Sequence, residues 1–218
     1  MLTTYQHIIW DWNGTLLDDA RLCLESLNIT LENRHMSPLT LAEYQEMFDF
    51  PVIDFYRKLG FDLEVVSFAD LAAEYHAEYG GRWRQCQLQP GALDLLEALS
   101  VAGVTQSVLS AAHQEMLEAC VDYFDLRRFF VAVVGLENNQ AHGKVERGRQ
   151  WMQQLEAAPH DVVLIGDTRH DFEVARAIGA DCKLVVSGHH RREKLETCPT
   201  EVFDNLTEVF NHRSPCDG

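Results

Sequence analysis

The chain has 218 residues, 46% of them hydrophobic, which is enough for one large or two small domains with a substantial core. Its 34 acidic and 18 basic residues give a formal net charge of −16. This charge argues against nucleic-acid or anionic-membrane partners, because both require clustered lysine and arginine. No signal peptide and no apolar run of bilayer length are apparent. The six scattered cysteines lack zinc-site spacing, so we expect a cytoplasmic protein with reduced cysteines.

The first half of the chain predicts one strand followed by helices. Residues 5–11 form a short apolar strand that ends in Asp11. Residues 19–34 carry apolar side chains at a spacing that favours a helix. Residues 38–85 are helical and rich in aromatic side chains, with no alternating strand pattern. We therefore expect a compact all-helical unit here, and we interpret the aromatic stretch at residues 74–83 as helix packing.

After Pro90-Gly91 the pattern changes to short apolar strands that alternate with helices. Strands are predicted over residues 105–110, 130–135, 161–167 and 182–186, and helices over residues 92–101, 113–123, 146–157 and 171–178. Such alternation predicts an α/β fold, a Rossmann-like parallel sheet with helices on both faces. Because the first strand belongs to this sheet, residues 1–17 and 89–218 are expected to form the core, with residues 18–88 inserted as a helical cap.

Polar side chains follow several predicted strands where those strands end. Asp11, Ser110 and Asp167 each end a strand, and Asp171 lies four residues after Asp167. The carboxyl ends of parallel strands lie at one edge of a sheet, where ligands bind. Carboxylates brought together there would repel one another, and Mg²⁺ with substrate phosphate oxygens resolves that conflict. We therefore predict a magnesium and phosphate site.

Other groups would complete a phosphate site. Ser110 and Lys144 would hold phosphate oxygens, and the backbone amides after Asp11, those of Gly14 and Thr15, would form an anion-binding turn. Taken singly, each candidate has a simpler interpretation. Asp11 fits a turn, Ser110 and Asp171 fit helix N-caps, and Lys144 fits a solvated surface lysine. The order of these residues along the chain favours the shared site.

Four short motifs in this order carry a resemblance to a known family. They are "DWNGTL" from Asp11, "SVLS" ending at Ser110, "GK" at Gly143-Lys144 and "GDTRHD" ending at Asp171. The chain resembles the haloacid dehalogenase superfamily over nearly its whole length. Residues 48–60 and 89–99 look like its phosphoglycolate-phosphatase branch. The helical insertion resembles the cap that this family carries after its first motif.

The resemblance implies a role for each candidate residue. Asp11 would be the nucleophile that forms an aspartyl-phosphate. Mg²⁺ would be held by Asp11, the backbone carbonyl of Asn13, Asp167 and Asp171, whereas Ser110, Ala111 and Lys144 would hold the phosphoryl group. In the cap, Arg57 is a candidate to close over an anionic substrate, and pairing with a cap carboxylate such as Asp54 is the alternative.

Asn13 departs from the family pattern, because most phosphatases of the family have aspartate there. An amide cannot transfer protons at neutral pH, and such transfer is typically worth about 10²–10⁴-fold. Four interpretations stay open. The protein is a phosphatase that acts on substrates with good leaving groups, or that uses another proton donor. His113, His189 and His190 are the candidates for such a donor. It is a phosphoryl-transfer enzyme with slow hydrolysis. It is a phospho-ligand or protein-binding module. Finally, deamidation of Asn13-Gly14 restores an aspartate.

Among these interpretations the sequence favours the enzyme, because Asp11, Ser110, Lys144, Asp167 and Asp171 are all present together. We expect a magnesium-dependent phosphatase that acts on a small phosphorylated metabolite resembling phosphoglycolate. The alternative is a catalytically weakened family member that binds a phosphorylated ligand or another protein. The sequence leaves the oligomeric state open.

Overall fold

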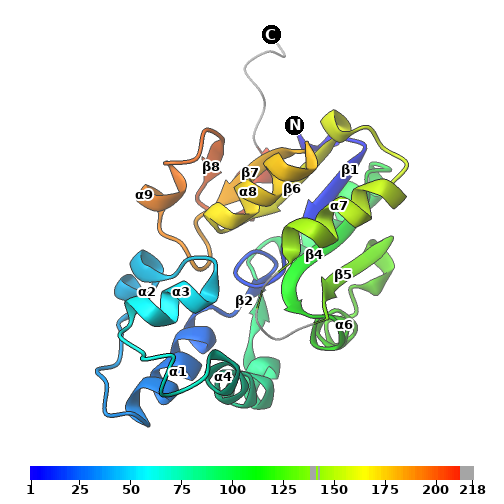
Figure 1. Cartoon of the computed structure of the whole chain (residues 1–218). Coiled ribbons are helices and arrows are strands. Elements are labelled where there is room, and N and C mark those ends of the chain that lie inside the picture. The colour runs from blue at the N-terminus through cyan, green and yellow to red at the C-terminus, as the bar shows by residue number, and fades with distance from the viewer. Residues whose placement is uncertain (138–140, 142, 212–218) are drawn as a thin grey trace.

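A computed structural model describes residues 1–137, 141 and 143–211 (Figure 1). Its centre is a six-stranded sheet in the order β5-β4-β1-β6-β7-β8, in which every neighbouring pair is parallel. The strands are β1 (His7–Trp10), β4 (Thr105–His113), β5 (Ala132–Leu136), β6 (Val162–Gly166), β7 (Asp181–Val185) and β8 (Glu201–Phe203). The predicted Rossmann-like α/β fold is confirmed.

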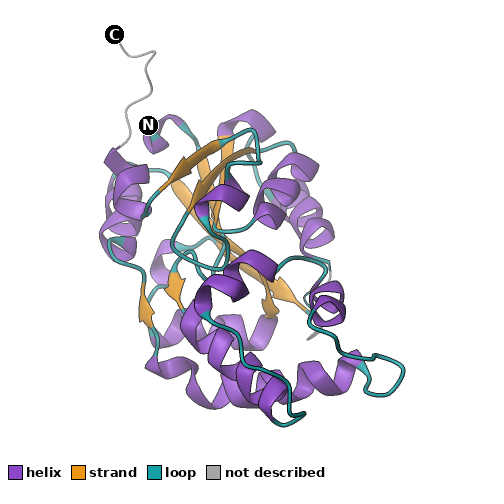
Figure 2. Ribbon diagram, turned by 90° about the vertical axis from the view of Figure 1, so that its left-hand side faces the viewer, coloured by secondary structure: helices purple, strands orange, loops and turns teal. Residues whose placement is uncertain are grey.

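Helices cover both faces of this sheet (Figure 2). They are α5 (Ala92–Val101), α6 (Gln114–Tyr123), α7 (Lys144–Gln154), α8 (Arg169–Ile178), α9 (Arg192–Leu195) and α10 (Leu206–Asn211). Successive residues of a strand point to opposite faces. Ile9 packs with α7 and α8 in one apolar cluster, whereas Ile8 packs with α5, α6 and α10 in another. All-apolar strands are therefore explained by burial on both sides.

The inserted segment forms helices α1 (Ala20–Glu32), α2 (Leu41–Met47), α3 (Val52–Lys58) and α4 (Phe68–Arg82) (Figure 1). Thr40 begins α2 with a capping box, and the Ser67 side chain caps α4. Both connections to the core run through one antiparallel ribbon, in which β2 (Leu17–Asp18) pairs with β3 (Gln87–Leu88). The expected boundary 17/18 lies within β2, and the expected boundary 88/89 lies at the end of β3.

Two details differ from the predicted elements. The strand predicted over residues 105–110 continues to His113, because pairing with β5 resumes at His113 and Leu136 after a register shift beyond Leu109. Ser110 therefore lies inside β4 and does not end it. The short strand β8 was not predicted, since three residues are too few to show a pattern. Within the described part of the chain, no helix has the length and apolar character needed to cross a membrane.

Candidate active site

Three buried carboxylates meet at the carboxyl end of the sheet. Asp11 follows β1 and Asp167 follows β6, and these strands pair in register with Trp10 beside Ile165. Asp171 lies in the first turn of α8, which Thr168 caps. One carboxylate oxygen from each of Asp11, Asp167 and Asp171 lies within 4.8 Å of the others. The structure thus brings together three residues that lie far apart in the sequence.

Lys144, at the start of α7, places its ammonium among these carboxylates. Its Nζ lies 2.5 Å from Asp11 Oδ1 and 2.5 Å from Asp171 Oδ1. Burial opposes the charge of Lys144, but Asp11 and Asp171 outweigh it and raise the lysine pKa. Burial likewise opposes the charge of Asp171, yet Lys144 holds the pKa of Asp171 below its usual value. Lys144 is therefore a buried, charged group, and the surface interpretation is wrong.

One ammonium does not neutralise the whole cluster. Burial, together with the charge of Asp171, raises the pKa of Asp11 well above its usual value. Burial also raises the pKa of Asp167 to about 6, although the positive charge of His189 opposes that rise. Buried carboxylates with raised pKa values call for more positive charge. Three convergent oxygen ligands and this charge deficit fit a divalent cation such as Mg²⁺.

Gly14 and Thr15 hold this cluster together. Thr15 is fully buried, and its Oγ1 donates to Asp167 Oδ1 at 3.0 Å. Gly14 has φ of +74°, and a methyl group there would overlap the Asp167 carboxylate and the His189 ring. The Gly14 amide donates to Asp19 Oδ1 at 2.9 Å. Neither residue lines the substrate cavity, so the structure corrects their predicted contact with substrate to a supporting role.

A cavity of about 570 Å³ opens above the carboxylates, between the core and the cap. The predicted site residues that line it are Asp11, Asn13, Ser110, Ala111, Lys144 and Asp171. The Ser110 Oγ accepts a hydrogen bond from Ala112 N at 3.1 Å, which leaves its hydroxyl proton free to be donated. Arg57 is absent from the lining, because its guanidinium binds Asp54 at 2.5 Å and stays more than half exposed. The structure shows the alternative, the ion pair with Asp54, and places Arg57 outside the cavity lining.

Asn13 is held by a carboxylate that the sequence analysis did not identify. Its Nδ2 donates to Asp19 Oδ2 at 2.6 Å and to the Tyr79 hydroxyl at 3.0 Å. Tyr79 and Cys23 also donate to Asp19 Oδ2, at 2.8 and 3.4 Å. Asp19 precedes α1 and looks like a helix cap in the sequence, but its side chain makes no cap bond. Its isolated position before a helix offered no other signal.

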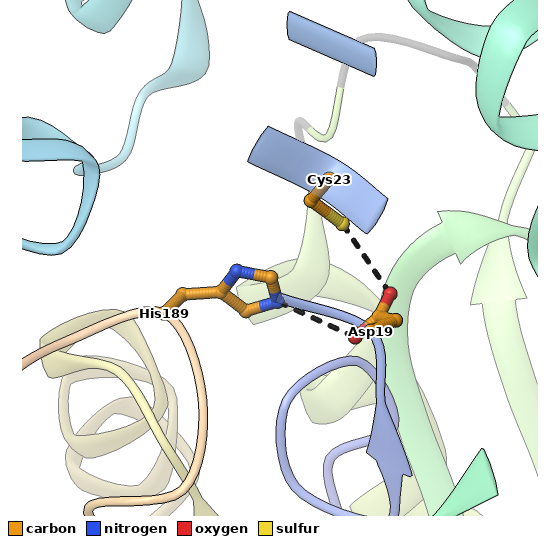
Figure 3. Close-up of side chains that lie close together, drawn as sticks. All are labelled: Asp19, Cys23 and His189. Atoms are coloured by element: carbon orange, nitrogen blue, oxygen red, sulfur yellow. Dashed lines mark hydrogen bonds and ion pairs between the residues drawn. The ribbon is translucent and has the colours of Figure 1, made fainter. Parts of the chain in front are cut away.

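His189 supplies the positive charge next to Asp19, and Figure 3 shows the two side chains with Cys23. The His189 Nε2 lies 3.7 Å from Asp19 Oδ1, and Nδ1 lies 2.9 Å from the Tyr44 hydroxyl. Burial opposes the charge of His189, but Asp19 and Asp167 outweigh it and raise the pKa of His189 to about 9. Burial opposes the charge of Asp19 as well, yet His189 and Asn13 hold its pKa below the usual value.

The other two candidate histidines differ in position. His113 lines the cavity with His189. His190 is fully buried, with Nδ1 accepting from Arg169 N and Nε2 3.0 Å from the Phe48 carbonyl. Burial and the nearby charge of Lys194 lower the pKa of His190 to about 3. His190 is therefore a neutral residue that joins the start of α8 to the end of α2, and it is not among the residues that line the cavity.

A Rossmann-like core with a capped cavity, a carboxylate in the cavity lining and a buried lysine defines a hydrolase that handles a phosphate-like anion. The chain belongs to the haloacid dehalogenase-like hydrolases, since the model of that family matches residues 8–185. It is thus an enzyme of the phosphatase type, and the resemblance stated from its motifs is confirmed.

Individual relatives and solved structures share low sequence identity with this chain. The tyrosine-protein kinase PtkA of Mycobacterium tuberculosis is 27% identical over 207 residues, which cover 94% of this chain and 70% of PtkA. A phosphoglycolate phosphatase of Agrobacterium fabrum is 26% identical over 212 residues, which cover 92% of this chain and 89% of that protein. A predicted phosphatase from Clostridium acetobutylicum has a similar structure, with a TM-score of 0.81 at 20% identity over 94% and 96% of the two chains.

Replacing Gly14 by alanine should remove activity by displacing Asp167. Gly103 is the matched control, because it also has positive φ, +79°, but no atom lies within 4 Å of a methyl group there. Gly103→Ala should cost about 1–2 kcal/mol of unfolding free energy from backbone strain alone and keep its activity. Gly14→Ala should lose more stability and most activity. Urea denaturation and phosphatase assays measure both effects, and equal behaviour of the two variants would contradict this role.

Asn13→Asp should destabilise the protein in a pH-dependent way, because it places a second carboxylate beside Asp19. The folded state would raise the pKa of the new carboxyl group above its unfolded value of about 4. The loss of stability should therefore be small near pH 4 and grow toward pH 7, to about 2–3 kcal/mol.

The double variant Asn13→Asp with Asp19→Asn exchanges the amide and the carboxylate. It should recover more than half of the stability that Asn13→Asp loses at pH 7, which a double-mutant cycle measures. An Asn13→Asp protein as stable as the parent at pH 7 would show that Asp19 does not require an amide partner.

Proposed function

We propose that this enzyme is a magnesium-dependent phosphatase that hydrolyses a small phosphomonoester through an aspartyl-phosphate on Asp11. The observation that carries the proposal is the position of Asp11. Its carboxylate lines the cavity beside Lys144, and one of its oxygens lies within 4.8 Å of carboxylate oxygens of Asp167 and Asp171, close enough for the three to share one ion. The relatives named phosphoglycolate phosphatase support a small phosphomonoester as the substrate class.

Asp11 performs the first step as a nucleophile. A carboxylate oxygen forms a bond to phosphorus while the bond from phosphorus to the leaving oxygen breaks, and the leaving oxygen keeps the electron pair. The Lys144 ammonium and the Ser110 hydroxyl hold the phosphoryl oxygens in line for this attack. Asp11, the Asn13 carbonyl, Asp167 and Asp171 would hold Mg²⁺, which when bound neutralises charge on the phosphoryl group.

The Asn13 side chain should slow the second step, hydrolysis of the aspartyl-phosphate. In this step water attacks phosphorus, the bond from phosphorus to Asp11 breaks, and the water must lose a proton. The Asn13 amide donates to Asp19 and Tyr79 and has no basic site for that proton. When the leaving group is good, the first step should therefore be faster than the second, and the phosphorylated enzyme should accumulate.

A second candidate function, transfer of the phosphoryl group to an alcohol or phenol acceptor, is favoured by this same amide. An intermediate that water hydrolyses slowly survives long enough to meet another acceptor. The similarity to a protein named tyrosine-protein kinase supports this candidate. Binding of a phosphorylated ligand without turnover is the remaining alternative.

Hydrolysis of p-nitrophenyl phosphate should require both Mg²⁺ and Asp11. We expect chelation with EDTA to stop turnover and Asp11→Asn to lower kcat by more than about 10³-fold. The control is Asp94→Asn on the exposed side of α5, which should leave kcat unchanged. If the parent protein shows no metal-dependent turnover but still binds phosphate, the non-catalytic alternative is supported and the phosphatase proposal fails.

The phosphorylated enzyme should be visible by intact mass after acid quenching. With excess aryl phosphate and Mg²⁺, we expect a burst of product followed by a slower steady rate, and a mass gain of one phosphoryl group that Asp11→Asn abolishes. Added acceptor alcohols or phenols should speed breakdown of this species if transfer occurs. Turnover without a burst and without an adduct would contradict rate-limiting hydrolysis of an aspartyl-phosphate.

A further inference from the structure

We propose that the preferred substrates of this enzyme are aryl phosphates, with the aromatic group bound by the cap, and not small anionic esters such as phosphoglycolate. The inference rests on the proposed phosphatase activity at Asp11 and names the substrate class of that site. Two independent features support it, the lining of the cavity and the chemistry of Asn13.

The cap side of the cavity is built from aromatic rings. Nine of the lining residues are phenylalanine, tyrosine or tryptophan, and all of them belong to the inserted helical segment. Phe50, Phe68 and Tyr75 are only half buried, so parts of their rings remain uncovered in the free protein. A volume of about 570 Å³ lies within the range of small-molecule sites. The cavity therefore offers apolar ring surface for an organic group larger than a two-carbon acid.

These rings are fixed by contacts with one another. Tyr75 stacks on Tyr79 with ring centroids 6.0 Å apart, and Phe50 stacks on His170 at 4.5 Å. Phe68 packs edge-on against Tyr56 at 5.6 Å. Rings held in place lose little freedom on binding, and a substrate ring gains from stacked or edge-on contacts beyond the burial of its area. The stretch at residues 74–83, expected to serve helix packing alone, thus also forms the cavity wall.

The cap offers a second carboxylate on the substrate few charged partners. The cap residues that line the cavity include no aspartate or glutamate, and those that can carry positive charge are His76 and Arg84. Arg84 is exposed and lies over the Trp83 ring at 4.4 Å. Arg57, the residue expected to bind such a carboxylate, is paired with Asp54 outside the cavity. A carboxylate placed among the rings, away from Arg84 and His76, would lose its hydration without a charged partner.

The reacting end of the site selects the same class of ester. Asn13 cannot protonate the departing oxygen, so position 13 favours a leaving group that is stable as an anion. A phenol has a pKa of about 10, whereas an alcohol is close to water, near 16. Phenolate therefore leaves unaided far more readily than an alkoxide. The cavity wall acts on the ring and the missing acid acts on the departing oxygen, and both favour an aryl group.

Four phosphate substrates test the effect of the ring and the effect of the leaving group separately. Phenyl phosphate has a ring and a good leaving group, benzyl phosphate has a ring and a poor leaving group, acetyl phosphate has a good leaving group without a ring, and phosphoglycolate has neither. With the full-length enzyme and Mg²⁺, we expect kcat to be at least about 100-fold higher for phenyl than for benzyl phosphate. We expect kcat/KM to be at least about tenfold higher for phenyl than for acetyl phosphate, and for benzyl phosphate than for phosphoglycolate.

Cap variants test whether the rings bind the substrate ring. Phe50→Ala and Phe68→Ala should raise KM for phenyl and benzyl phosphates by about 3–10-fold and change the values for acetyl phosphate and phosphoglycolate less than twofold. Phe210→Ala, an exposed aromatic truncation on α10 outside the cavity lining, is the control. If a cap variant does not fold, the comparison of the four substrates on the parent enzyme remains the test.

The outcomes distinguish this inference from the proposed function. If no phosphate ester is hydrolysed with Mg²⁺, the phosphatase proposal itself fails. If phosphoglycolate matches or exceeds phenyl phosphate in kcat/KM, the enzyme is a phosphatase but the aryl inference is overturned. If phenyl and acetyl phosphates react equally and the cap variants affect both alike, leaving-group chemistry alone selects substrates and the assignment of the ring cavity is wrong.

Discussion

The burial of like charges at the carboxyl end of the sheet is the constraint on which this enzyme depends. Asp11, Asp167 and Asp171 are buried and repel one another, and the single ammonium of Lys144 offsets only part of that repulsion. The fold tolerates the arrangement because the hydroxyl of Thr15 and the cap of α8 supply hydrogen bonds to the same carboxylates. The remaining charge deficit is what makes the site suited to a divalent cation and a phosphate.

A fourth buried carboxylate, Asp19, determines how the site differs from a phosphatase with aspartate at position 13. It accepts hydrogen bonds from the Asn13 amide and from Tyr79 and forms an ion pair with His189. A carboxylate at position 13 would face Asp19 directly, so the amide and Asp19 belong together. The proposed attacking group, Asp11, is retained, whereas an amide at position 13 cannot transfer a proton. Because Tyr79 is part of the cap, the same network also links the cap to the turn that follows Asp11.

Much of the architecture could be predicted from local patterns. Apolar strands alternating with helices predicted the parallel sheet, and the strand-ending residues Asp11 and Asp167 predicted where the site lies. Lys144 could be placed only through its motif, because a lone lysine before a helix resembles a surface residue. The strand β8 and the ribbon of β2 and β3 are too short to leave a periodic signal.

What the sequence could not show depends on contacts between distant segments. Asp19 resembles a helix cap, and its role follows from Tyr79 and His189, which lie 60 and 170 positions away in the chain. The charge of Arg57 suggested a substrate contact, whereas an ion pair with Asp54 keeps it at the surface. The aromatic stretch at residues 74–83 has a helical spacing that suits packing, and only the tertiary structure shows that it also faces a cavity.

The most direct test of the account is a crystal structure of the enzyme with Mg²⁺ and beryllium trifluoride, an analogue of an aspartyl-bound phosphoryl group. The account predicts the analogue on an oxygen of Asp11, contacted by Lys144 and Ser110, with the cation between Asp11 and Asp167. It also predicts that the Asn13 side chain stays on Asp19. A cation bound elsewhere, or an analogue that does not contact Asp11 under conditions that support turnover, would contradict the assignment of Asp11 as the nucleophile.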